Sequence, residues 1–78
     1  MPNIIIYSTP ACHYCLMAKE ILTKNGLAYT DKNLAVDEAA REEALKKSGH
    51  LITPIFDIDG QIVVGFDEEI LKKVLGIK

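Results

Sequence analysis

The chain has 78 residues, 49% of them hydrophobic and 26% charged, and its formal net charge is -2. This length predicts one domain over residues 1–78, and the high apolar content with low net charge excludes the composition of a disordered chain. Lysines and arginines form no basic block, which argues against nucleic-acid binding. No apolar run approaches the ~20 residues that span a bilayer, so we expect a cytoplasmic protein with no membrane partner.

The first part of the chain predicts a strand, a helix and a second strand. Residues 3–8 are β-branched and aromatic without polar alternation, which is typical of a strand buried on both faces. Apolar residues recur at helical spacing over 12–25, until Gly26 ends the run. Residues 27–34 predict a second strand, parallel to the first because a whole helix separates them.

A second helix is predicted over residues 38–47, with Asp37 as its N-cap. Its apolar face is thin and consists of Ala40, Ala44 and Leu45. Its charged residues are expected to form a solvated face: Arg41, Glu42, Glu43, Lys46 and Lys47. A further hypothesis is that Lys47 attracts an anionic peptide. Beyond this helix, we expect His50 to be a loop residue and Asp57 to face water.

The last part of the chain predicts a hairpin and a third helix. Asp59 and Gly60 form a strong hairpin signal between strands at 55–58 and 61–64. Asp67 is the expected N-cap of the last helix. The apolar stripe of that helix consists of Ile70, Leu71, Val74 and Leu75. The order β-α-β-α-β-β-α predicts an α/β fold with three helices on a mixed four-stranded sheet.

The two cysteines of the chain, Cys12 and Cys15, form one C-x-x-C at the start of the first predicted helix. A disulfide across so small a loop stabilises a fold by only roughly 2 kcal/mol, so chemistry explains the pair better than a structural role. In the first turn, free N–H groups and the positive end of the helix dipole favour a thiolate at Cys12. We therefore predict that Cys12 is the nucleophile and that Cys15, one turn further in, is the resolving thiol.

Other interpretations of the cysteine pair stay open at this point. The two thiols are also compatible with ordinary core cysteines, or with a vestigial motif in a non-catalytic interaction domain. Two thiolates make half of a zinc site, which His13 or His50 would have to complete. The C-x-x-C is also compatible with an iron–sulfur cluster shared between two chains in a dimer.

Two further segments join the cysteine motif in a recognisable pattern. The three are Tyr-Ser-Thr-Pro-Ala-Cys-His-Tyr-Cys over residues 7–15, Ile-Thr-Pro over 52–54, and Gly-Phe-Asp over 65–67. Together they resemble the glutaredoxins, including the small NrdH-redoxin branch of the thioredoxin superfamily, over essentially the whole chain. The resemblance implies a thioredoxin fold and a monomeric thiol-disulfide oxidoreductase, with no bound cofactor, that reduces protein or small-molecule disulfides. The implied electron donor is glutathione, as reductant or co-substrate, or a thioredoxin reductase.

The resemblance also implies the substrate-binding residues. These are Tyr14, Thr53, Pro54, Gly65, Phe66 and Asp67. Pro54 would be a cis-proline facing the cysteine pair, and the backbone of Thr53 would bind an extended substrate. Gly65 and Asp67 would hold the γ-glutamyl end of glutathione at a helix N-terminus.

Four positions depart from the pattern of glutathione-dependent members. Thr9 stands where many of them carry a lysine, and Ile52 and Val64 replace the usual threonine and glycine. These changes predict weak use of glutathionylated substrates and leave the dithiol chemistry intact. His13 replaces the usual proline, and it either stabilises the neighbouring thiolate and modulates the redox potential or is merely solvated.

Overall fold

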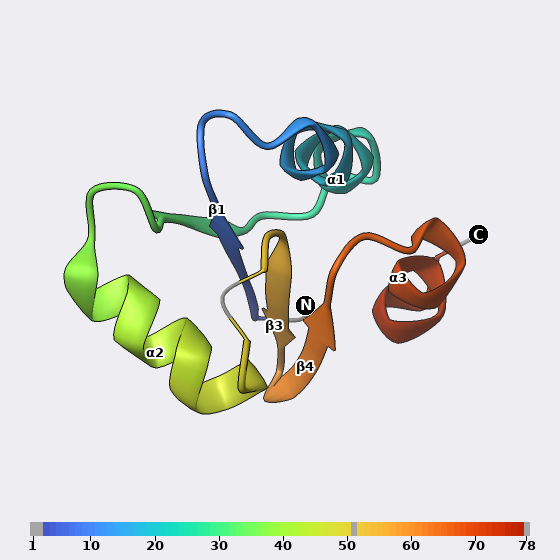
Figure 1. Cartoon of the computed structure of the whole chain (residues 1–78). Coiled ribbons are helices and arrows are strands. Elements are labelled where there is room, and N and C mark those ends of the chain that lie inside the picture. Colours follow the sequence, from blue (N-terminus) through green and yellow to red (C-terminus); the bar gives the residue numbers. More distant parts are fainter. Residues whose placement is uncertain (1–2, 51, 78) are drawn as a thin grey trace.

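The computed structural model describes residues 3–50 and 52–77, and it confirms the predicted α/β order (Figure 1). The elements are β1 (Ile4–Ser8), α1 (His13–Lys24), β2 (Thr30–Asn33), α2 (Glu38–Ser48), β3 (Ile55–Ile58), β4 (Gln61–Val64) and α3 (Glu68–Leu75). Of the helices within these described ranges, none combines the length and the apolar character needed to cross a membrane.

The four strands form one mixed sheet in the order β2-β1-β3-β4. β1 runs parallel to β2 and antiparallel to β3, which places Ile6 between Asp31 and Phe56. The β3–β4 hairpin turns at Asp59 and Gly60, whose φ angles are 51° and 90°. Positive φ at both turn residues is what a tight two-residue hairpin requires, and the strands have the predicted bounds.

The helices cover both faces of the sheet, with α1 and α3 on one face and α2 on the other (Figure 1). The larger core lies under α1 and α3, and its buried residues are Ile4, Ile6, Ala18, Leu22, Phe56, Ile58, Val63 and Leu71. The smaller core lies under α2, and its buried residues are Tyr7, Leu34, Ala40, Ala44 and Ile55. Because strand side chains alternate in direction, neighbouring residues of β1 enter different cores.

Two predictions about the early and middle elements are wrong in part. The second strand is shorter than the expected 27–34, because the N–H of Leu27 donates to the C=O of Leu22 at 2.9 Å and closes the end of α1. The expected apolar face of α2 includes Leu45, but this side chain is 46% exposed. Apolar packing of α2 therefore relies on two alanines, and the rest of its attachment to the sheet is polar.

The third helix follows its prediction at the N-cap and departs from it in the apolar stripe. Asp67 caps α3, and Leu71 is fully buried, with Val74 and Leu75 partly buried against the larger core. Ile70 is 48% exposed, so it lies at the margin of the expected stripe rather than within it.

Candidate active site

Cys12 occupies the N-cap of α1, directly after the turn that leaves β1. The turn is closed by the N–H of Cys12, which donates to the C=O of Thr9 at 3.2 Å. The Sγ of Cys12 accepts a hydrogen bond from the N–H of Cys15 at 3.1 Å. A cysteine sulfur thus takes the place that a serine or aspartate oxygen takes at an ordinary N-cap. The same donor that satisfies the helix end would stabilise negative charge on Cys12.

The second cysteine lies deeper in the protein than the first. Cys15 is 1% exposed in the first turn of α1, whereas Cys12 is half-buried. The two sulfurs are within disulfide-bonding distance, and the Cα atoms are 5.2 Å apart. The pair can therefore be oxidised without backbone movement, and of its two sulfurs Cys12 is the more accessible.

The Ile-Thr-Pro segment has the backbone geometry expected of it. The peptide bond between Thr53 and Pro54 is cis, and Pro54 is buried while Thr53 is half-buried. The C=O of Pro54 accepts a hydrogen bond from the N–H of Gly65 at 2.8 Å. This bond joins the second motif to the third at the start of the connection to α3.

An aromatic contact joins the first motif to the third. The rings of Tyr14 and Phe66 stack with centroids 5.8 Å apart and an interplanar angle of 21°. The ring of His13 meets Tyr14 edge-on, at 6.2 Å between centroids. Tyr14 is 57% exposed, so the stack forms an aromatic surface beside the start of α1. Nothing in the sequence pattern predicted this contact, because the two rings lie far apart along the chain.

The third motif ends in a capped helix start. Oδ1 of Asp67 accepts hydrogen bonds from the N–H groups of Glu69 and Ile70, at 3.1 and 3.2 Å. Gly65 has φ 81°, a left-handed conformation that favours glycine. The first turn of α3 also carries Glu68 and Glu69, so three carboxylates gather at this helix N-terminus.

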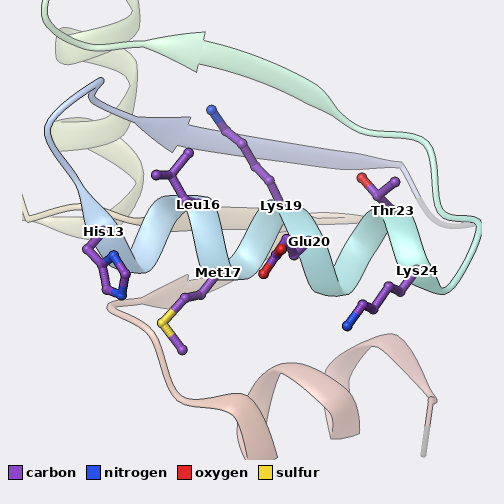
Figure 2. A pocket seen from close by; sticks show the side chains of 7 residues that line it. All are labelled: His13, Leu16, Met17, Lys19, Glu20, Thr23 and Lys24. Carbon is purple, nitrogen blue, oxygen red and sulfur yellow. The ribbon is translucent and has the colours of Figure 1, made fainter.

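A hollow that the sequence did not predict runs along the outer face of α1 (Figure 2). Its volume is about 700 Å³, and it is lined by His13, Leu16, Met17, Lys19, Glu20, Thr23 and Lys24. In Figure 2, Met17 extends from α1 toward the segment that leads into α3. The hollow begins at His13, the residue after Cys12, and mixes apolar side chains with charges of both signs.

The interpretation of the cysteine pair as part of a metal site is not supported by the arrangement of the described residues. Across residues 3–50 and 52–77, no three His, Cys, Asp or Glu side chains gather where they could hold a metal ion. His50 follows α2 as an exposed loop residue, and His13 points its ring at Tyr14. Neither histidine completes a site with the cysteines.

A network of polar side chains lies between α2 and the sheet. The hydroxyl of Tyr7, a fully buried residue, donates to Glu43. Lys47 donates to the same hydroxyl at 2.9 Å and to Oδ2 of Asp57 at 2.5 Å. Lys32 donates to both carboxylate oxygens of Glu43 at 3.0 Å. The expectation that Asp57 faces water is wrong, because its side chain is 13% exposed and bound to Lys47.

The same network corrects the expected solvated face of α2. Glu43 and Lys47 point at the sheet, so Lys47 is bound within the protein and does not present a free charge to an anionic peptide. Hydrogen bonds from Tyr7 and then Lys32 lower the pKa of Glu43 to about 2. Burial, followed by the bond to Glu43, raises the pKa of Tyr7. The bonds to Asp57 and Tyr7 raise the pKa of Lys47.

Sequence comparison finds similar proteins over most of the chain. The glutaredoxin family model matches residues 4–63. The glutaredoxin-like 8.6 kDa protein in the rubredoxin operon of Clostridium pasteurianum is 39% identical over 72 residues, which cover 92% of this chain and 96% of that protein. Glutaredoxin 3 of Escherichia coli (strain K12) is 35% identical over 68 residues, covering 87% and 82%.

Structure comparison gives the same result for the fold. A mutant form of the thioredoxin-like protein BC3987 matches with a TM-score of 0.92 at 37% identity, over 100% of both chains. A glutaredoxin from Archaeoglobus fulgidus matches with a TM-score of 0.84 at 22% identity, over 96% of this chain and 87% of its own. The expected thioredoxin fold is therefore confirmed.

Proposed function

The chain belongs to the glutaredoxin family, and on that premise we propose that it reduces disulfides through a dithiol made of Cys12 and Cys15. Thiol-disulfide oxidoreductase activity follows from the family; the role of each residue is our proposal. One observation carries it: a half-buried Cys12 takes a hydrogen bond at the N-cap of α1, within bonding distance of a Cys15 that is 1% exposed. The accessible sulfur suits attack, and the buried one suits resolution.

The reaction proceeds in two exchange steps. The thiolate of Cys12 attacks one sulfur of the substrate disulfide, which forms a mixed disulfide and releases the other substrate sulfur as a thiolate. Cys15 then loses its proton and attacks the sulfur of Cys12, which releases the second substrate sulfur. The substrate gains two electrons, and the protein is left with the Cys12–Cys15 disulfide. An external thiol or reductase then restores the dithiol.

The substrate would bind in an extended form beside Cys12. The backbone N–H and C=O of Thr53 are the proposed hydrogen-bonding edge, ahead of the cis peptide bond to Pro54. Gly65 supports this edge through its bond to Pro54, and Phe66 supports the exposed ring of Tyr14. Asp67 and Gly65 would orient the end of a substrate that reaches the start of α3.

Protein disulfides suit this site better than glutathione. Thr9 supplies no cation for a glutathione carboxylate, and the start of α3 already carries Glu68 and Glu69. The electron donor in our proposal is glutathione or a thioredoxin reductase, and the protein acts as a cytoplasmic monomer without a bound cofactor. Oxidised protein offered each donor in turn identifies the donor by the faster reduction.

Single-cysteine variants test the roles of the two sulfurs. Cys15→Ser should accumulate a mixed disulfide on Cys12 when offered a disulfide peptide, and Cys12→Ser should form none. Mass spectrometry of the trapped species identifies the sulfur that attacks. An adduct on Cys15 in the Cys12→Ser variant, with none on Cys12 in the other, would reverse the assignment. Wild-type protein that reduces no disulfide at all would refute the proposed function.

A further inference from the structure

Lys47 and Asp57 close the segment that carries the proposed substrate edge. Lys47 lies in the last turn of α2, and Asp57 lies in β3, so Thr53 and Pro54 fall between them. The Nζ of Lys47 is 2.5 Å from Oδ2 of Asp57. The side chain of Lys47 is 30% exposed and that of Asp57 is 13% exposed, so the carboxylate is the more shielded partner.

Both members of the pair are held by further hydrogen bonds. Lys47 also donates to the hydroxyl of Tyr7 at 2.9 Å and to Glu43 at 3.3 Å. The other carboxylate oxygen of Asp57 accepts from the N–H of Gly60 at 2.8 Å. Neither side chain is free to swing away, so the pair fixes the end of α2 relative to β1 and β3.

The end of α2 has little else to hold it against the sheet. Its buried side chains are Ala40 and Ala44, and the adjacent Leu45 is 46% exposed. Two methyl groups bury little apolar area, so the polar contacts carry most of the attachment at this end. At the last residue of the helix, the Oγ of Ser48 accepts from the N–H of His50 at 3.0 Å.

We propose that Lys47 is a positioning residue for the substrate-binding edge at Thr53, an inference that rests on the function proposed above. Lys47 acts by pinning the last turn of α2 to Asp57 and Tyr7. Asp57 lies in β3, which follows directly on Thr53 and Pro54, so the pinned strand sets the position of the backbone that presents Thr53. Loss of the Lys47 ammonium would leave Oδ2 of the shielded Asp57 carboxylate without its hydrogen-bond donor, and the last turn of α2 would loosen. Substrate binding would weaken, whereas the attacking sulfur at the other motif would be unaffected.

The test compares Lys47→Met with Lys46→Met. Both substitutions remove one positive charge from the same helical turn, but Lys46 is exposed and makes no ion pair within residues 3–50 and 52–77. Reduction of a disulfide-linked peptide is followed with excess dithiothreitol as the electron source, so the natural donor is not needed. We expect Lys47→Met to raise KM roughly two- to thirtyfold with kcat nearly unchanged, the signature of lost uniform binding. Lys46→Met should match the wild type, and Lys47→Arg should recover most of the loss.

Alkylation of Cys12 by iodoacetamide separates positioning from a general structural effect. This reagent needs no peptide edge, so its rate and pH profile should be the same in Lys47→Met and wild type. If Lys47→Met fails to fold, Asp57→Asn provides the same comparison while Lys47 keeps its bond to Tyr7. An unchanged KM in a folded variant, or equal loss of peptide reduction and alkylation, would overturn the inference. Absence of peptide reduction in the wild type would instead overturn the proposed function.

Discussion

Protonation of Glu43 should contribute measurably to unfolding in acid. This carboxylate accepts hydrogen bonds from Tyr7 and Lys32, which lower its pKa from an ordinary 4.5 to about 2. A carboxyl whose pKa is lower in the folded state stabilises the fold above the unfolded pKa. The stabilisation is therefore complete above pH 4.5 and is lost as the pH falls through 2. Replacing Glu43 with glutamine should remove this part of the acid dependence.

The size of the effect follows from the pKa difference and the exposure of the group. The displacement from 4.5 to about 2 corresponds to about 3.4 kcal/mol at 1.36 kcal/mol per pKa unit. The side chain of Glu43 is 34% exposed, and solvent screens its interactions accordingly. We expect a contribution of about 1–2 kcal/mol to the free energy of unfolding at neutral pH.

Urea unfolding between pH 7 and pH 2 measures this contribution. The wild type should lose about 1–2 kcal/mol more than Glu43→Gln over this range, so the two curves should converge in acid. Glu42→Gln is the matched control, because Glu42 is the neighbouring residue of α2 and its side chain is exposed. Parallel pH curves for wild type and Glu43→Gln would refute the reasoning, as would an equal effect in the control.

Three further substitutions extend the reasoning to the site. His13→Pro should make the dithiol more reducing by on the order of 30 mV, since the substitution removes a polar ring beside the thiolate of Cys12. Equilibration against a glutathione buffer measures the redox potential. An equal or higher potential would mean that His13 is only solvated. Thr9→Lys should speed deglutathionylation severalfold at low salt and less at high salt, because salt screens an exposed lysine. The same deglutathionylation rate at low and high salt would contradict an electrostatic effect of this lysine. Tyr7→Phe should cost about 1–2 kcal/mol in urea unfolding, because Glu43 and Lys47 lose their hydroxyl partner; no loss would mean that water replaces it.

The elements of the fold could be predicted where the signal is local. Asp59 and Gly60 suit positive φ by themselves, so the hairpin and its strands have the expected bounds. β2 begins later than predicted because Leu27 closes the end of α1, and its polar residues are a strand only through pairing with β1, a contact that no short window contains. The spacing of Leu45 is compatible with a core position, but Leu45 lies with Glu38, Arg41 and Glu42 on the outer face of α2 and is 46% exposed.

The candidate site also has some features that a local sequence signal predicts and others that no local signal predicts. The proposed roles of Cys12 and Cys15 rest on a spacing of three residues at a helix start, which the sequence displays directly. The stack of Tyr14 on Phe66 joins two motifs that are distant in the chain, so no local pattern predicts it. The sequence predicts an exposed Asp57 because a carboxylate in an apolar strand normally faces water, and the partner that overturns this prediction, Lys47, comes from a different element.

The start of α3 explains why the same fold should favour protein disulfides over glutathione. A helix N-terminus attracts carboxylates because its first N–H groups have no partner. Here the N–H groups of Glu69 and Ile70 already donate to Asp67, and Glu68 adds a further carboxylate, which pairs with Lys72 at 3.3 Å. A glutathione carboxylate would meet net negative charge at this helix end and no lysine at position 9. In our proposal an extended peptide binds through the backbone of residue 53 and the aromatic surface, neither of which depends on charge.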